Sequence, residues 1–365
     1  AALYMAEAYA RMTGGIGVAM VTAGAGLCNA LAPLFTATQS QTPILLLSGD
    51  SEAELDGRGS FQEMEQVKIT CALTKYSQRI NDAQNLIPVA SKAIKLAENG
   101  VPGPTHLALA ADILSSEVAE PFTYSEQPHK DIPNDPEPSK KLIKAFALAK
   151  TPLILLGPCF GMPQHKGKLK ELDTQLNTPV VMMESPRGFN DPRLGNIKSM
   201  ISLADLIIVV GKPIDFTLSY GSVDAFNADA HWFVYIGSDE LVAKALCNLG
   251  NRMKEAKNIA PSAAINMLQK MTHERTDDRK WVDSLRKAIE RRDFSILKKP
   301  NDYSELNSLT FASTVNKILS SYEDVIAVSD GGEIGQWVQS FLGQYLVMIN
   351  GTSGAIGGSL SYAMA

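Results

Sequence analysis

The sequence lacks several features that would assign it to a function class at once. It has no run of basic residues, and its net charge is −5. It therefore lacks the clustered positive surface with which proteins bind a nucleic acid backbone. No apolar run reaches the roughly 18 residues that a membrane-spanning helix requires. We expect neither a nucleic acid partner nor a membrane partner.

Cysteine is also scarce. The four cysteines, Cys28, Cys71, Cys159 and Cys247, lie far apart and lack the short spacings of metal ligands. Each lies in or beside an apolar or helical run, which predicts buried free thiols. Free thiols are typical of a reducing compartment, so we expect a cytoplasmic protein.

The sequence does contain a regular alternation of short apolar runs and helical patterns over its 365 residues. The apolar runs are nearly continuous, as in parallel strands that are buried on both faces. This alternation predicts an α/β fold of doubly wound parallel sheets. The predicted strands are 16–21, 43–48, 105–110, 152–156, 179–183, 206–210, 232–236, 325–329 and 346–349. The predicted helices include 86–98, 139–149, 166–176, 239–249, 262–271 and 312–321.

Two stretches interrupt the alternation and predict linkers. Residues 117–138 carry several prolines and many charges, and residues 274–302 are dense in charge. The predicted domains are therefore 1–116, 139–273 and 303–365. The chain opens and closes inside helical patterns, whereas natural termini fray in polar segments. We therefore expect a fragment whose first and last domains are partial.

The segment from Thr22 to Asn29 is a glycine-rich turn after a predicted strand. Glycine has no Cβ, so such a turn lets the backbone approach a ligand. Gly24, Gly26 and the later Asp50 mimic the glycines and ribose-binding acid of a dinucleotide fingerprint. Asn29 stands where that fingerprint has its third glycine, so dinucleotide binding stays only as an alternative.

Two further segments have local explanations. In residues 57–66, Ser60 and Glu63 have the spacing of a capping box, which predicts a helix start there. In residues 100–112, Gly-Pro punctuation enters an edge-like strand. His106 alternates with apolar neighbours in that strand, which favours a structural role over a catalytic one.

Two last segments, 329–337 and 350–358, are rich in glycine, and each follows a strand and precedes a helix. Open α/β sheets bind ligands at such strand ends, and helix N-termini there favour anions. Asp330 and Glu333 lie in the first of them. We interpret these two carboxylates as parts of a solvated loop rather than as metal ligands.

In this order and spacing, the segments resemble the thiamine diphosphate-dependent family of acetolactate synthase-like decarboxylases and carboligases. The turn from Thr22 to Asn29 resembles the family's threonine-alanine-glycine-proline-glycine loop, with Ala25 in place of proline. The other matching segments are 6–14, 61–63, 103–104, 185–195, 204–211 and 354–357. The resemblance implies part of a pyrimidine-binding domain, a central Rossmann-like domain and the start of a diphosphate-binding domain.

The resemblance also implies an activity. Family members decarboxylate a 2-keto acid such as pyruvate and pass the carbanion to an acceptor, with thiamine diphosphate as the electron sink. They are homo-oligomers, so we expect a dimer or tetramer. Two alternatives stay open, namely an acyl-CoA lyase like oxalyl-CoA decarboxylase and a non-catalytic nucleotide-binding module.

Site residues follow from the resemblance in the same way. Phe61 and Gln62 would face the reacting carbon and act in catalysis. Ile356 would be the stiff apolar wedge that bends the cofactor. The predicted cofactor-binding residues are Thr22, Gly24, Gly26, Asn29, Gly332, Gly354 and Ile356.

Other parts of the family's site are expected outside the chain. The activating glutamate would precede Ala1, and the magnesium-binding motif would follow Ala365. We therefore predict no metal ligand in the chain and no activity of the chain alone. Some relatives bind FAD or ADP in the central domain. Here Pro158 removes an N–H that could meet a phosphate, which leaves FAD in doubt.

Overall fold

The computed structural model describes residues 1–117, 136–271, 279–291, 307–343 and 345–365. These residues form two compact units. The first comprises residues 1–117 with Met162–Gln164 and Ser361–Ala365. The second comprises Pro136–Gly161 and the described residues from His165 to Leu360.

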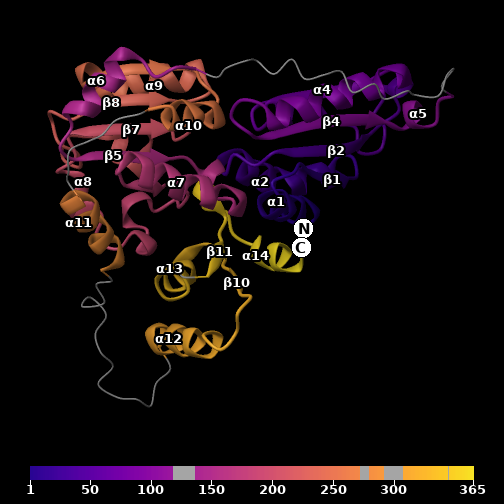
Figure 1. Ribbon diagram of the computed structural model, residues 1–365. Coiled ribbons are helices and arrows are strands. Elements are labelled where there is room, and N and C mark those ends of the chain that lie inside the picture. Colours follow the sequence, from indigo (N-terminus) through magenta and orange to yellow (C-terminus); the bar gives the residue numbers. More distant parts are fainter. Residues whose placement is uncertain (118–135, 272–278, 292–306, 344) are drawn as a thin grey trace. The chain divides into compact units, whose positions relative to one another are not determined.

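The first unit is built on a four-stranded parallel sheet with strand order β1-β2-β4-β3. Leu34 of α2 and Leu46 of β2 belong to the core on one face of the sheet, together with residues of α1. Ala93 of α4 and Leu107 of β4 belong to the core on the other face. Figure 1 shows α1 and α2 on one side of the sheet and α4 on the other. The strands are β1 (Gly17–Val21), β2 (Ile44–Asp50), β3 (Tyr76–Ile80) and β4 (Pro104–Ala110). The helices are α1 (Ala2–Thr13), α2 (Ala25–Gln39), α3 (Gln66–Cys71), α4 (Leu86–Glu98) and α5 (Ala111–Leu114).

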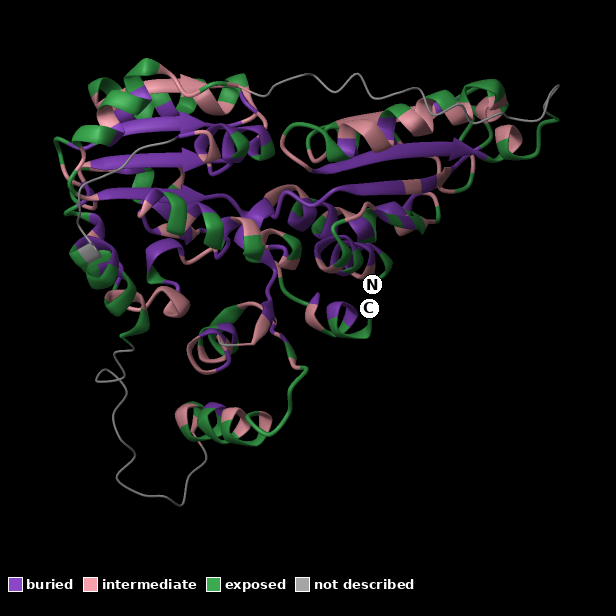
Figure 2. Ribbon diagram, in the orientation of Figure 1, coloured by how far each residue is buried: buried purple, intermediate pink, exposed green. Residues whose placement is uncertain are grey.

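The second unit contains a five-stranded parallel sheet with strand order β6-β5-β7-β8-β9. Its central strands are buried on both faces (Figure 2). Helices α6, α7 and α10 supply the core on one face, and α8, α9 and α11 supply it on the other. The strands are β5 (Pro152–Leu156), β6 (Val180–Met182), β7 (Leu206–Val210), β8 (His231–Tyr235) and β9 (Met253–Lys257). The helices are α6 (Lys140–Leu148), α7 (Lys166–Leu176), α8 (Lys198–Ile201), α9 (Asp239–Leu249), α10 (Pro261–Gln269) and α11 (Arg279–Glu290).

The last part of the chain adds a two-stranded parallel sheet of β10 (Ile326–Val328) and β11 (Leu346–Met348). It also contributes α12 (Ser308–Leu319), α13 (Gly332–Phe341) and α14 (Ser359–Met364). The α/β fold with doubly wound parallel sheets is therefore confirmed, since helices cover both faces of the four-stranded and five-stranded sheets.

Two sequence interpretations are wrong. The strand that carries His106 is not an edge strand, because β4 lies between β2 and β3 and all seven of its residues are buried. The thiols are not uniformly buried either. All four cysteines are free, but only Cys159 is buried, while Cys28, Cys71 and Cys247 are exposed. These three lie on α2, α3 and α9, each of which buries only one face.

Helix α11 lies inside the predicted linker 274–302. Trp281, Val282 and Leu285 are buried in the core of the five-stranded sheet, and the indole Nε1 of Trp281 donates to the carbonyl of Pro152 at 2.8 Å. This part of the predicted linker is therefore a packed element. Most of the linker 117–138 lies outside the described residues, and the domain boundaries stay a prediction.

Candidate functional site

The turn from Thr22 to Asn29 is the start of a helix. Helix α2 begins at Ala25, and Gly24 is its N-cap with φ 56°. A Cβ on Gly26 would lie 2.2 Å from Oγ1 of Thr22, so Gly26 is needed for packing within the turn. The side chains of Thr22 and Asn29 are exposed, whereas Gly24 is buried.

The fold brings this turn against a second predicted segment. A Cβ on Gly24 would lie 2.8 Å from Cβ of Gln62, and Gln62 has φ 62°, which is uncommon for a residue other than glycine. The two predicted site residues Gly24 and Gln62 therefore touch. A left-handed residue in such close contact is typical of functional turns, where surrounding structure maintains the strain.

Gln66 connects the two segments, and the sequence did not single it out. Its Oε1 accepts from the backbone N–H of Gly24 at 3.2 Å, and its Nε2 donates to the carbonyl of Gly49 at 2.8 Å. Gln66 is 2% exposed. The sequence feature that could have indicated this role is a glutamine four positions after Gln62, directly before the apolar positions of α3.

Glu63 fixes the loop that presents Phe61. Its carboxylate accepts from the backbone N–H groups of Gly57 at 2.5 Å, Gly59 at 2.9 Å and Ser60 at 2.9 Å. These donors hold the pKa of Glu63 below its ordinary value, and the N–H of Gly57 has the largest effect. Phe61 is 87% exposed, so a large apolar surface stands free at an ordered turn.

The helix start predicted at Ser60 is therefore wrong. Helix α3 begins six residues later, at Gln66. Ser60 and Glu63 do make the backward hydrogen bond of a capping box. The carboxylate, however, closes the glycine loop rather than the first turn of a helix.

In the second unit, Asp330 organises the loops around the predicted residues Gly354 and Ile356. Its carboxylate accepts from the N–H of Gly331 at 2.8 Å and from that of Gly357 at 2.8 and 3.0 Å. It also accepts from Nδ2 of Asn350 at 2.9 Å and from Oγ of Ser359 at 3.3 Å. Burial acts to raise the pKa of Asp330, but these donors outweigh it and hold the pKa below its ordinary value. Asp330, interpreted from the sequence as part of a solvated loop, is half-buried, and its carboxylate holds these loops together.

The turn that Asp330 holds presents Ile356 to solvent. Ile356 is 74% exposed. A Cβ added at Gly354 or at Gly332 would meet no atom within 4 Å, so the backbone is open to a ligand at both positions. Within the described residues, the buried Oδ1 of Asn350 has no hydrogen-bond partner. An open backbone, an exposed apolar wedge and an orphaned acceptor fit a polar, partly aromatic ligand such as thiamine diphosphate.

Arg187 supports this region instead of offering its charge to a ligand. Its Nη1 donates to Oε1 of Gln339 at 3.1 Å, and its Nη2 donates to the carbonyl of Gly332 at 2.5 Å. Gln339 is fully buried. Arg187 thus fixes Gly332, which is the first residue of α13 and one of the predicted cofactor-binding residues.

The structural role predicted for His106 is confirmed. Its Nε2 lies 2.8 Å from Oγ of Ser48, and its Nδ1 lies 2.9 Å from both Oγ1 of Thr70 and Oγ of Ser77. Burial lowers the pKa of His106 to about 4. The imidazole is therefore neutral near pH 7 and ties β4 to β2, β3 and α3.

Two positions at which the sequence weighed nucleotide binding are engaged in internal contacts. The carboxylate of Asp50, the acid of the dinucleotide alternative, pairs with Nε of Arg79 at 2.8 Å. After β5, a Cβ on Gly157 would lie 2.1 Å from the carbonyl oxygen of Gly211, and Pro158 is buried. That turn is closed by packing and offers no open glycine cradle for a nucleotide phosphate. Among the described residues, no cluster of three or more histidine, cysteine, aspartate or glutamate side chains is arranged to hold a metal ion.

Comparison with known proteins agrees with this geometry. Residues 1–69 match the family described as thiamine pyrophosphate enzyme, N-terminal TPP binding domain. This match confirms the predicted resemblance to the thiamine diphosphate-dependent enzymes.

The chain is similar to 2-hydroxyacyl-CoA lyase 2 and to acetolactate synthase. It is 26% identical to 2-hydroxyacyl-CoA lyase 2 of Caenorhabditis elegans, over 91% of this chain and 58% of the relative. It is 28% identical to the Homo sapiens protein of the same name, over 61% of this chain and 42% of the relative. It is 32% identical to the acetolactate synthase isozyme 3 large subunit of Escherichia coli strain K12, over 50% of this chain and 32% of the relative. The chain thus spans between about a third and about three fifths of the length of these relatives. Within the described residues, no helix combines the length and apolar character needed to cross a membrane.

Proposed function

We propose that the protein containing this chain is a thiamine diphosphate-dependent enzyme that makes or breaks a carbon–carbon bond next to a carbonyl group. The observation that carries the proposal is the turn anchored by Asp330, which presents Ile356 beside the open backbone of Gly354. When bound, thiamine diphosphate supplies a nucleophilic carbon and accepts the electron pair released at the carbonyl carbon. The family match of residues 1–69 supports the same cofactor.

The roles proposed for the chain's own residues follow from their positions. In the second unit, Ile356 would impose the bent shape of the cofactor, and the carbonyl of Gly354 would accept a hydrogen bond from it. Gly332 would leave room for the ligand at the start of α13. The magnesium ion expected with the diphosphate has no assigned ligand in this chain.

In the first unit, Gly24 and Gln62 form one contact, and Gln66 holds Gly24 by accepting from its backbone N–H. Thr22, Gly26 and Asn29 belong to the same turn and would bind the cofactor's ring. Phe61, exposed beside Gln62, would exclude water from the reacting carbon while the Gln62 amide orients a substrate oxygen.

The first candidate substrate is a 2-keto acid such as pyruvate. The enzyme would release carbon dioxide and transfer the remaining acyl carbon to an acceptor, as a dimer or tetramer. The acetolactate synthase relatives support this candidate, although they align with only about half of the chain.

The second candidate is cleavage of the C1–C2 bond of a 2-hydroxyacyl-CoA, which gives formyl-CoA and an aldehyde one carbon shorter than the acyl chain. The relatives named 2-hydroxyacyl-CoA lyase 2 favour it, because the alignment with the Caenorhabditis elegans protein covers 91% of this chain. Both candidates share the cofactor and the bond type.

The test is an assay of the full-length protein that contains this chain, with thiamine diphosphate and magnesium. Pyruvate is supplied to one reaction and a 2-hydroxyacyl-CoA to another, and carbon dioxide and aldehyde are measured separately. Cofactor-dependent release of either product supports the shared proposal and chooses between the candidates. Absence of thiamine diphosphate binding by calorimetry, together with no release of either product, would refute it.

A further inference from the structure

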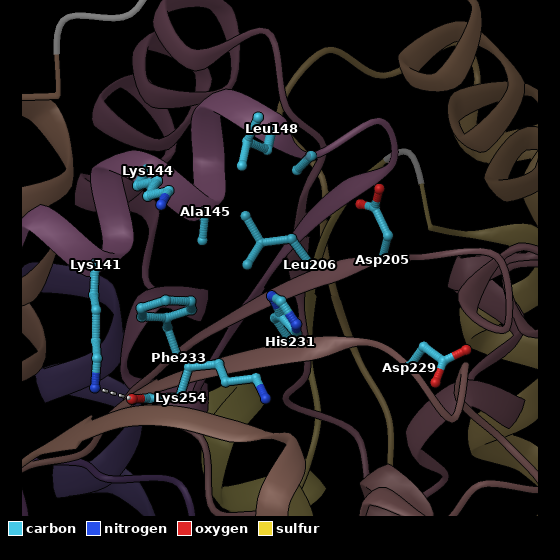
Figure 3. A pocket seen from close by; sticks show the side chains of 11 residues that line it. Lys141, Lys144, Ala145, Leu148, Asp205, Leu206, Asp229, His231, Phe233 and Lys254 are labelled. Carbon is cyan, nitrogen blue, oxygen red and sulfur yellow. Dashed lines mark hydrogen bonds between the residues drawn. The ribbon is translucent and has the colours of Figure 1, made fainter.

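The second unit contains a cavity of about 390 Å³ that the proposed function does not use. It lies between α6 and the first residues of β7, β8 and β9 (Figure 3). Open parallel sheets bind their usual ligands at the carboxyl ends of the strands. This cavity is at the opposite, amino ends, and it is therefore separate from the turns at Gly157 and Gly211.

One face of α6 forms a wall of the cavity. Lys141, Lys144, Ala145 and Leu148 line it, and their spacing of three and four residues places them on one side of the helix. The opposite side of α6 packs into the core. Leu148 is nevertheless 72% exposed, so a large apolar side chain stands at the cavity with little protein covering it.

The floor of the cavity is apolar. Leu206 begins β7, and Phe233 lies two residues after the start of β8. Both line the cavity, and each is only 1% exposed. Together with Ala145 and Leu148 they surround the space in which Figure 3 shows these side chains converging.

The rim carries more positive than negative charge. Lys141, Lys144 and Lys254 line it together with Asp205 and Asp229, which leaves one excess positive charge. The carboxylate of Asp205 is engaged, since it accepts from the N–H of Lys150 at 2.7 Å and from that of Thr151 at 3.0 Å.

Two rim donors are available. Within the described residues, the ammonium of Lys144 and the imidazole of His231 have no hydrogen-bond or ion-pair partner, whereas Nζ of Lys141 donates to the carbonyl of Lys254 at 3.5 Å (Figure 3). Lys144 and Leu148 lie on the same wall of the cavity, so a cation without a partner among the described residues stands near an apolar side chain. An anion with an apolar body would meet both kinds of surface at once.

We propose that this cavity is a binding site for a free small monocarboxylate with an apolar body. A volume near the lower end of the ~300–1,000 Å³ range of small-molecule sites limits the ligand to a compact acid. A single excess positive charge matches one carboxylate better than a multiply charged phosphate. The carboxylate contacts Lys144 and His231, and the apolar body covers Leu148, Leu206 and Phe233.

The test measures binding of 3-phenylpropionate to the 365-residue chain by isothermal titration calorimetry. The uncharged 3-phenylpropanamide has the same shape and tests the carboxylate, and inorganic phosphate tests the charge without the apolar body. We expect saturable binding of the acid and binding at least about tenfold weaker for the amide and for phosphate, which corresponds to roughly 1.4 kcal/mol. Thiamine diphosphate should not compete, so this result is independent of the proposed function.

Two pairs of variants locate the site. Leu148→Asp should weaken binding by about tenfold or more, because it removes apolar contact and adds a negative charge that repels the carboxylate of the ligand. Its control is Leu246→Asp on α9, which changes another exposed leucine away from the cavity. Lys144→Gln should weaken binding by about threefold to tenfold. Its control is Lys140→Gln on the same helix, because Lys140 does not line the cavity.

Three results would overturn the proposal. The first is no saturable binding of the acid by the folded chain, with folding checked by circular dichroism. The second is an equal loss of affinity in a variant and its matched control. The third is phosphate binding as tight as that of the acid, which would show a cation cluster without an apolar site.

Discussion

At the scale of single residues, Ile356 carries the proposed role that is simplest to separate from stability. It is 74% exposed, so Ile356→Ala removes little buried surface and should leave the melting temperature of the protein unchanged. In the full-length enzyme the same variant should lower kcat by roughly 10- to 100-fold, because small errors in the position of reacting groups cost this much. Cofactor affinity should change much less.

The measurement is kcat and the Kd of thiamine diphosphate for Ile356→Ala beside Ile356→Leu, which keeps a bulky apolar group. Normal turnover with a lowered melting temperature would assign Ile356 a purely structural role. Equal losses of kcat and of cofactor affinity would indicate that Ile356 only adds binding contact with the cofactor and does not impose its bent shape.

His106 gives a prediction about pH. Its pKa is lowered from 6.5 to about 4 in the folded chain, so between these values the unfolded chain binds a proton that the folded chain does not. Stability is therefore retained above pH 6.5 and is lost as pH falls toward 4. For one histidine, the free energy of unfolding should fall by about 2 kcal/mol between pH 7 and pH 5.

Urea unfolding at the two pH values tests this with His106→Gln, whose side chain does not titrate. The variant should be less stable at pH 7, because three hydroxyl contacts are disturbed, yet its change between pH 7 and pH 5 should be smaller by about 2 kcal/mol. His231→Gln replaces an exposed histidine and is the matched control. An identical change with pH in wild type and His106→Gln would contradict the buried neutral imidazole.

At the scale of elements, the sequence predicted the buried strands and missed two edge strands. β5 and β7 begin and end where their continuous apolar runs do. β3 and β9 were not predicted, because Tyr76–Ile80 and Met253–Lys257 mix polar and apolar residues and are mostly half-buried. An edge strand packs on fewer neighbours, so its sequence carries a weaker pattern.

The candidate site shows the same limit. The glycine turns could be predicted because glycine spacing is local. Gln66 and Asp330 could not be assigned their partners, because each binds backbone groups of loops that the sequence alone does not place in space. Asp330, for example, reaches the N–H of Gly357, which is 27 residues away.

Asp330 therefore gives the prediction for an element, the turn from Gly354 to Gly357. Asp330→Ala leaves the N–H groups of Gly331 and Gly357 without their acceptor, which should cost about 1–3 kcal/mol of stability. Hydrogen exchange at the amide of Gly357 should accelerate, as should exchange in the rest of this turn. Ser359→Ala removes a single donor at 3.3 Å and should have a small effect. Unchanged exchange at Gly357 in Asp330→Ala would show that other contacts hold the turn.

At the scale of the whole molecule, it was the order of several weak motifs along the chain that indicated the resemblance to this family. Each motif alone has a local explanation, such as a helix start or a strand entry. The first motif, Thr22 to Asn29, supports dinucleotide binding as readily as thiamine diphosphate when it is considered by itself. Only the combination with 61–63 and 354–357 favours one cofactor, and substrate choice depends on loops that no pattern in this sequence specifies.

The rejected dinucleotide alternative yields the last prediction. A dinucleotide site needs glycines that open the turn to a pyrophosphate and a free acid for the ribose. Here Gly26 packs against Thr22, so the turn is not open at this glycine. The carboxylate of Asp50 is paired with Arg79. NAD at up to millimolar concentration should therefore not raise the melting temperature of the chain, since only a ligand that binds the folded state does so. The measurement is differential scanning fluorimetry, with an NAD-dependent dehydrogenase as positive control. A concentration-dependent rise that is abolished by Asp50→Asn would restore the dinucleotide site and remove the basis for assigning this turn to thiamine diphosphate.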